Sequence, residues 1–266
     1  MRIVRFLDRN KSPEYGVLDE GTPGVVRVLL GDPFRGIKLG GGEAYQRMLA
    51  PLAPPLIYAL GLNYRDHAGE TGVALPDRPV VFLKAPTSVV GPGDAVLLPK
   101  AGPGEVDYEG ELAVVIGKRG KNIPVDQALG HVFGYTCACD VTARDWQNRL
   151  QKKQWARGKS FDTFCPLGPW IVTADEIRDP GKLHLVTRLN GQVVQDAPTA
   201  DLIFSVPEII ADLSRSLTLL PGTVILTGTP AGVGFTRQPP LFLKAGDRVE
   251  VEISSIGTLA NHVELE

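Results

Sequence analysis

The sequence predicts an α+β protein in which strands outnumber helices. Thirty glycines and 22 prolines are spread along 266 residues without a repeat or a low-complexity tract, which is typical of many turns between short strands. Short apolar runs rich in β-branched residues recur along the chain, whereas clear amphipathic helical spacing occurs over residues 206–217. No G-x-G-x-x-G motif is present, which argues against a dinucleotide-binding fold.

Residues 1–50 are predicted to form a small β-rich domain, separate from residues 56–266. We expect a loop over the glycines of 36–45, a helix over 43–49 and a proline-rich linker over 51–55. Strands of this small domain are predicted at residues 2–7, 15–18 and 25–30.

Residues 56–266 are long enough to bury a sizeable core, and their pattern predicts a mainly β domain. Asn190-Gly191 between two alternating runs predicts a hairpin over 183–194. Short helices are expected over 124–129 and 142–150, and a mobile flap over the polar stretch 71–78. Further strands are predicted at 56–60, 80–84, 95–98, 105–116, 132–139, 224–226, 247–253 and 257–263.

Charge and cysteine content limit the classes of partner. The formal net charge of −2 gives no support to binding of nucleic acid or of a membrane surface. The three cysteines, Cys137, Cys139 and Cys165, lack the spacing of a disulfide framework or a zinc site. No basic-then-apolar leader and no apolar run of about 18 residues occurs. We therefore expect a soluble, cytoplasmic protein.

Three carboxylates form the first candidate site. Glu109 and Glu111 alternate on one predicted strand, so both side chains point to the same face. Two buried anions at the head of a strand repel each other unless a cation or bound protons neutralise them. A hard divalent ion such as Mg²⁺ or Mn²⁺ suits oxygen ligands, and Asp140 would be the third carboxylate. The alternative is a pair of glutamates on a solvated strand face, each in a salt bridge.

His67 and Glu70 form a candidate catalytic pair. If a short helix begins at residue 63 or 64, the two side chains lie three positions apart on one face. A carboxylate beside an imidazole orients the ring and raises its basicity, which suits a general base. The alternative is an ordinary His–Glu pair on the surface.

Four further residues have chemistry that suits an acidic substrate. Arg144 could bind a carboxylate with two hydrogen bonds, and Gln147 on the same helix face could bind a carbonyl. Lys159 in its apolar setting would place a positive charge beside an oxyanion. Thr229 offers a hydroxyl in a glycine-rich turn. Taken singly, these residues also fit an exposed helix face, a surface lysine and a plain loop.

Together these stretches resemble the fumarylacetoacetate hydrolase family. The motifs occur in family order from about residue 56 to the end; they are LNYRDHAGE, VVFLKAPTSVVGPGD, VDYEGELAVVIG, GYTCACDVTARDWQ, KSFDTFCPLGP, LNGQVVQ, LLPGTVILTGTPAGVG and LKAGDRVEVEISSIGTLAN. The resemblance implies a mixed β-sandwich or roll with few helices, and a homodimer.

The resemblance also implies a role for each candidate residue. Glu109, Glu111 and Asp140 would bind Mg²⁺ or Mn²⁺, and His67 with Glu70 would be the catalytic pair, with Lys159 stabilising charge. The remaining candidates, Arg144, Gln147 and Thr229, would bind substrate oxygens. Two departures from fumarylacetoacetate hydrolase itself, a shorter N-terminal domain and Leu60 in place of a fourth acidic ligand, indicate the short bacterial branch.

The short branch implies a metal-dependent enzyme that acts on 2-oxo or 2-hydroxy-dienoic dicarboxylic acids through an enolate. We expect 2-hydroxyhepta-2,4-diene-1,7-dioate isomerase, with possible decarboxylase activity, in the breakdown of aromatic compounds. The alternatives are an acylpyruvate hydrolase and an oxaloacetate decarboxylase. A non-catalytic module that binds metal or oxo acid is a further alternative, although a binder has no need of a positioned base.

Overall fold

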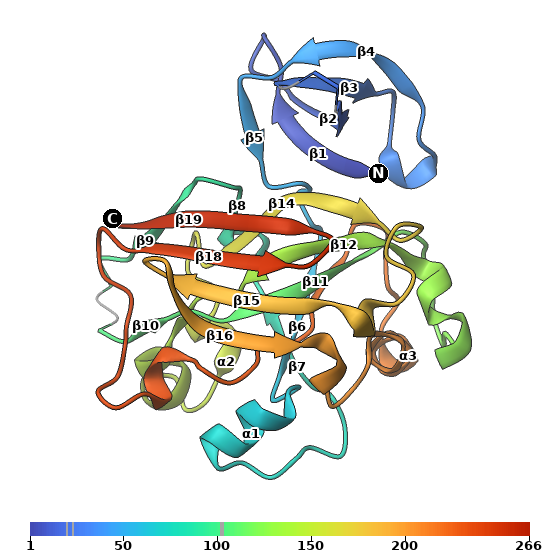
Figure 1. Cartoon of the computed structure of the whole chain (residues 1–266). Coiled ribbons are helices and arrows are strands. Elements are labelled where there is room, and N and C mark those ends of the chain that lie inside the picture. Colours follow the sequence, from blue (N-terminus) through green and yellow to red (C-terminus); the bar gives the residue numbers. More distant parts are fainter. Residues whose placement is uncertain (20, 23, 102–103) are drawn as a thin grey trace.

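A computed structural model describes residues 1–19, 21–22, 24–101 and 104–266. The strands within these residues form a twelve-stranded sheet, a five-stranded sheet and a two-stranded ribbon. Figure 1 shows the five-stranded sheet in front of the central part of the larger sheet, with the N-terminal strands at one end of the molecule and α1 at the other. The predicted α+β class with a strand majority is confirmed.

The N-terminal strands make up one end of the twelve-stranded sheet. They are β1 (Arg2–Leu7), β2 (Pro13–Leu18), β3 (Val25–Leu29), β4 (Leu39–Ala44) and β5 (Arg47–Leu49). The predicted loop over 36–45 and helix over 43–49 are wrong, because β4 pairs with β3 and β5 pairs with β1. These pairings between distant residues override the helical preference of the local sequence.

The central strands continue the same sheet. They are β6 (Ile57–Gly61), β7 (Val80–Lys84), β11 (Gly110–Ile116), β12 (Val132–Cys139), β14 (Cys165–Thr173) and β17 (Val224–Leu226), with β8 (Val89–Val90) beside β14. β1 pairs with β14, so the sheet runs without interruption from the N-terminal strands to the centre. The division into domains at residues 1–50 and 56–266 therefore stays a prediction.

The five-stranded sheet has the order β16–β15–β18–β19–β9. Its strands are β9 (Ala95–Leu98), β15 (His184–Leu189), β16 (Gln192–Pro198), β18 (Arg248–Ile253) and β19 (Gly257–Leu265). The predicted hairpin is confirmed: Asn190 and Gly191, both with positive φ, connect β15 to β16. Apolar side chains of this sheet and of β11 and β12 share one buried core.

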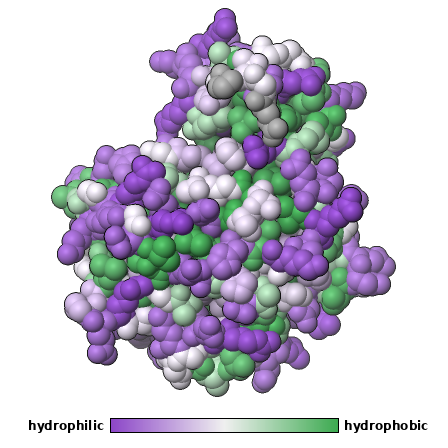
Figure 2. Space-filling view, in the orientation of Figure 1, coloured by the Kyte–Doolittle hydropathy of each residue, from purple (hydrophilic) through white to green (hydrophobic). Residues whose placement is uncertain are grey.

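Among the residues that the structure describes, three α-helices and several shorter helical turns surround the sheets. They are α1 (Arg65–Thr71), α2 (Trp155–Gly158) and α3 (Val206–Ser216). The amphipathic prediction for α3 is confirmed, because Ile209, Ile210 and Leu213 are buried on one side. None of the helices in the described part of the chain has the length and apolarity that a membrane span requires. On the face in Figure 2, hydrophobic side chains occur in several patches among hydrophilic ones.

The predicted helix over 142–150 has a different beginning. Residues Thr142–Ala143 form strand β13, which pairs with β10 (Val106–Asp107) in the two-stranded ribbon. A π-helical turn follows over Trp146–Leu150. The expected helix over 124–129 is a 3₁₀ helix over Val125–His131, and residues 73–79 lack regular structure.

Candidate active site

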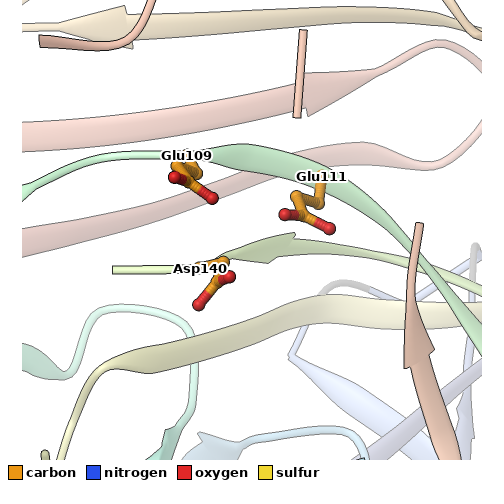
Figure 3. A group of neighbouring side chains, drawn as sticks. All are labelled: Glu109, Glu111 and Asp140. Atoms are coloured by element: carbon orange, nitrogen blue, oxygen red, sulfur yellow. The ribbon is translucent and has the colours of Figure 1, made fainter. Parts of the chain in front are cut away.

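Glu109, Glu111 and Asp140 converge at the junction of two neighbouring strands. Glu109 immediately precedes β11, Glu111 lies within it, and Asp140 follows β12; the pairing of Gly110 with Cys139 aligns the two strands. The nearest carboxylate oxygens of the three residues all lie within 4.8 Å of one another, and all three residues are buried. Figure 3 shows the three side chains close together. The predicted cluster is present, and metal binding by it stays a prediction.

Two buried lysines contact this cluster. The Lys159 ammonium donates to Glu109 Oε2 at 2.8 Å, to Asp140 Oδ2 at 2.6 Å and to Thr142 Oγ1 at 2.7 Å. All three of its ammonium hydrogens therefore have acceptors within the protein. Lys159 can thus act on a substrate through its positive charge but not by donating a further hydrogen bond. Lys84 at the end of β7 donates to Asp140 Oδ1 and to the Lys159 carbonyl. The local sequence around Lys84 predicts only the end of a strand and not a contact with the cluster.

Arg144 lies between two carboxylates. Its Nε donates to Asp107 Oδ2 at 2.9 Å, and Nη1 lies 2.7 Å from Glu109 Oε1. Nη1 also donates to Gln147 Oε1 at 3.1 Å, which leaves the Gln147 amide hydrogens for other acceptors. The buried Asp107 was missed, although it continues the alternation of Glu109 and Glu111 by two residues.

The charges of this buried group fit a bound cation. Four carboxylates face three cations, which leaves one negative charge without a counter-charge; the group consists of Asp107, Glu109, Glu111 and Asp140 with Lys84, Arg144 and Lys159. Glu111 carries that charge, because Oε2 accepts only the Gly228 amide at 2.6 Å and Oε1 has no partner among the described residues. A hard divalent ion would fill this role, so the residues fit such an ion.

The pKa values of the two glutamates move in opposite directions. Burial raises the pKa of Glu109, but the adjacent Lys159 and Arg144 have the larger combined effect and lower it to about 2. Burial, followed by the charges of Asp140 and Glu109, raises the pKa of Glu111 well above its ordinary value. Without a bound cation, Glu111 is therefore the residue of this cluster that holds a proton.

His67 and Glu70 are brought together by α1, as predicted. His67 Nδ1 lies 3.1 Å from Glu70 Oε2. Burial raises the pKa of Glu70, but hydrogen bonds from His67, from Thr236 and from the Gly232 amide have the larger combined effect and lower it. An ionised Glu70 can only accept hydrogen bonds, so Nδ1 carries the ring hydrogen and Nε2 is left as the basic nitrogen.

A cavity of about 240 Å³ joins the histidine to the carboxylate cluster. Its polar lining includes His67, Glu109, Arg144, Gln147, Lys159 and Thr229. Leu60, Leu62, Val73, Trp155 and Phe235 supply much of the apolar lining. Six of the nine predicted site residues thus line one cavity, and the other three, Glu70, Glu111 and Asp140, contact residues that line it or cluster with Glu109.

Thr229 lines the cavity, but its hydroxyl hydrogen is used within the protein. The hydroxyl donates to the Gly110 carbonyl at 2.9 Å and accepts from Gln195 Nε2 at 2.7 Å. Gln195 was missed, and its Oε1 accepts the Gly110 amide at 2.9 Å. Gln195 and Thr229 therefore fix the backbone between Glu109 and Glu111.

The model of the fumarylacetoacetate (FAA) hydrolase C-terminal family matches residues 56–264. The chain belongs to this family. A second model, described as Rv2993c-like, N-terminal, matches residues 1–51. The family match confirms the resemblance that the ordered motifs indicated.

Relatives within the family are named for two kinds of activity. Human oxaloacetate tautomerase FAHD2A, a mitochondrial protein, is 51% identical over 216 residues, covering 81% of this chain and 68% of the relative. The structure of 5-carboxymethyl-2-hydroxymuconate delta-isomerase from Mycobacterium smegmatis is 39% identical, with a TM-score of 0.88 and complete coverage of both chains. That of 2-hydroxyhepta-2,4-diene-1,7-dioate isomerase from Mycobacterium marinum is 38% identical, with a TM-score of 0.81, and covers 100% of this chain and 99% of its own.

Proposed function

We propose that this protein is a tautomerase that interconverts the keto and enol forms of a short 2-oxo dicarboxylic acid, with oxaloacetate as the substrate. The observation that carries the proposal is the His67–Glu70 pair, oriented by hydrogen bonds, on the same cavity as the carboxylate cluster. Relatives named oxaloacetate tautomerase, at 51% identity, support this choice of reaction.

The chemistry requires one proton to move between carbon and oxygen. His67 Nε2 takes a proton from C3 of the keto acid and delivers it to the C2 oxygen, so that a C–H bond breaks, an O–H bond forms and the imidazole returns to its neutral form. Glu70 accepts the hydrogen on His67 Nδ1 and so orients the ring. The Glu70 carboxylate also stabilises the His67 imidazolium that exists while the ring carries the proton from C3.

Glu109, Glu111 and Asp140 would hold a divalent ion, Mg²⁺ or Mn²⁺, which would supply Lewis-acid polarisation of the 2-oxo group when bound. Lys159 and Arg144, which both contact Glu109, add positive charge to the lining of the cavity. The free amide hydrogens of Gln147 suit a carboxylate oxygen of the substrate.

The size of the cavity supports a short substrate. Its volume of about 240 Å³ lies below the roughly 300–1,000 Å³ of pockets that hold drug-sized ligands. The cavity therefore suits a small acid, a class that includes the four-carbon diacid and the seven-carbon dienedioate.

The isomerisation of 2-hydroxyhepta-2,4-diene-1,7-dioate is the second candidate. It is supported by whole-chain similarity to a solved isomerase of that name, at 38% identity. The same base could take the proton of the C2 hydroxyl of that dienol acid and deliver it to C5, so that an O–H bond breaks, a C–H bond forms and a 2-oxo-3-ene acid results. Decarboxylation and acylpyruvate hydrolysis additionally break a C–C bond.

An enol-absorbance assay tests the proposal. The protein with Mg²⁺ or Mn²⁺ is mixed with freshly dissolved enol-oxaloacetate, and the loss of enol absorbance is compared with that in the metal-containing buffer alone. Pyruvate release is measured in parallel, together with turnover of acetylpyruvate and of the dienedioate. We expect faster loss of enol without pyruvate; a rate equal to that of the buffer would overturn the proposal.

The expected homodimer and cytoplasmic location stay predictions. Light scattering after size-exclusion chromatography checks the dimer. The named human relative is mitochondrial, so the compartment requires a direct test by fractionation.

A further inference from the structure

The turn at residues 232–237 contacts two carboxylates, each of which is hydrogen-bonded to a residue that lines the cavity: Glu70 to His67, and Asp107 to Arg144. It contains a 3₁₀ helix over Gly234–Thr236. On one side it donates hydrogen bonds to Glu70 of α1, and on the other side to the buried Asp107 of β10. Neither the turn nor Asp107 belongs to the predicted site.

The contacts with Glu70 complete the surroundings of the catalytic pair. The Gly232 amide donates to Glu70 Oε1 at 3.0 Å, and the Thr236 hydroxyl donates to the same oxygen at 2.7 Å. Thr236 has a second acceptor, the Val233 carbonyl at 2.9 Å. The ionised carboxylate is the stronger acceptor and receives the hydrogen preferentially.

The turn itself is held by buried groups. Asp107 Oδ1 accepts the Gly234 amide at 2.8 Å, and Oδ2 accepts the Phe235 amide at 3.0 Å. A Cβ at Gly234 would lie 1.9 Å from the Leu241 carbonyl oxygen, so only glycine permits this close approach. Arg237 donates to the Val194 carbonyl at 2.7 Å. The Thr236 hydroxyl is therefore presented from a fixed support, unlike a side chain on a free loop.

We propose that Thr236 is a positioning residue of the His67–Glu70 pair, and that Asp107 holds the turn that presents it. Three donors then fix both oxygens of Glu70: Thr236 and Gly232 bind Oε1, which leaves Oε2 for His67 Nδ1. This inference rests on the proposed proton transfer by His67. It assigns to Thr236 an effect on the rate of that step and not on substrate affinity.

The test compares Thr236→Val, which removes the hydroxyl at nearly constant shape, with Thr236→Ser, which keeps it. Thr258→Val is the matched control, because Thr258 is exposed on β19 of the five-stranded sheet. We expect kcat of the valine variant to fall roughly tenfold, as is typical when a group that orients a catalytic side chain is lost, with KM within about twofold. The serine variant should recover most of the loss.

A second measurement uses the metal-free protein and no turnover. The ¹³C signal of the Glu70 carboxyl, assigned with Glu70→Gln, is followed across pH. Loss of a donor to the ionised form raises the pKa, so the Glu70 midpoint should rise in Thr236→Val and return in Thr236→Ser.

The outcomes separate the two proposals. An unchanged kcat and an unchanged Glu70 midpoint in Thr236→Val would overturn the role of Thr236, as would a serine variant as impaired as the valine variant. A wild-type protein without tautomerase activity would overturn the proposed function, while the carboxyl titration would still decide whether Thr236 holds Glu70.

Discussion

Glu111 is the acidic residue of the cluster without a counter-charge, and this makes the metal-free protein sensitive to pH. The pKa of Glu111 is higher in the folded protein than in the unfolded chain, so the protonated side chain favours the folded state. This stabilisation is complete at pH values below the unfolded-state pKa of about 4.3. That contribution is lost as the pH rises through the folded-state pKa. We therefore expect the free energy of unfolding of the metal-free protein to decrease as the pH rises through the folded-state pKa. With added Mg²⁺, the free energy of unfolding should not show this decrease.

Denaturant unfolding at several pH values, with and without Mg²⁺, measures this effect. Glu111→Gln is the control, because it removes the titrating group. Identical pH dependence in the wild type and in Glu111→Gln would contradict the prediction.

Glu109 and Glu111 should differ in what their removal does to stability. Glu109→Ala removes one of the two carboxylate partners of each of the buried cations Lys159 and Arg144, which keep Asp140 and Asp107. Loss of a buried hydrogen-bond partner destabilises by about 1–3 kcal/mol. Glu111→Gln replaces a carboxyl group that holds a proton in the metal-free protein with a neutral amide of similar shape, and should not destabilise that form. Both variants should lose metal binding in calorimetry. Equal loss of stability in the two variants would show that the charge count is wrong.

His67→Ala should separate proton transfer from metal binding. The histidine is hydrogen-bonded to Glu70 and is not a member of the group of three clustered carboxylates, so metal binding in calorimetry should be retained. Loss of a general base lowers the rate by roughly 10²–10⁴-fold. A fully active His67→Ala would remove the assigned base.

The sequence could predict these residues only in part. Alternation on a strand identifies Glu109 and Glu111, but the same alternation includes Asp107, and spacing does not tell which carboxylate faces an arginine. Lys84 could not be recognised, because its partner Asp140 is 56 positions away and the contact depends on how the strands pair. The resemblance to the family's motifs was needed to group residues that lie far apart in the sequence into one site.

At the scale of elements, β11 and β15 approach each other closely beside the cluster. A Cβ at Gly110 would lie 2.0 Å from Thr187 Oγ1 on β15. Gly110→Ala should therefore destabilise the protein by about 1–3 kcal/mol and weaken metal binding, since Gly110 separates Glu109 from Glu111. Gly191→Ala in the hairpin turn is the comparison, because its Cβ would meet open space.

Gly191→Ala should cost about 1 kcal/mol through its positive φ and leave metal binding unchanged. Denaturant unfolding and calorimetry of both variants check the contrast. If Gly110→Ala binds metal as tightly as the wild type, β11 accommodates the added methyl group without displacing Glu109 and Glu111, and the prediction is wrong.

Some secondary-structure elements of this protein can be predicted from local sequence alone, and others cannot. The Asn190-Gly191 hairpin and α3 were predicted because turn chemistry and helical spacing are local signals. β4 and β5 were not, because glycines favour a loop locally while pairing with β3 and β1 is decided by the rest of the sheet.

At the scale of the whole molecule, the N-terminal strands share a core with the central sheet. Ile3 and Leu52 belong to the same buried cluster as Ile171 of β14, and Ile3 pairs with Ile171. A chain of residues 56–266 alone should therefore unfold at a lower temperature than the full chain, because β14 loses a neighbour and apolar surface is exposed. Equal melting temperatures in calorimetry would establish residues 56–266 as an independent domain.

The two halves of the active site differ in how far apart their parts lie along the chain. The acidic cluster belongs to neighbouring strands of a single hairpin, β11 and β12, whereas Glu70 meets its donors Gly232 and Thr236 across 162 and 166 positions. Because loop closure costs more entropy for distant residues, we expect the contacts between near neighbours to form first. A chain that is still partly folded would thus capture a cation before it acquires the ability to move a proton.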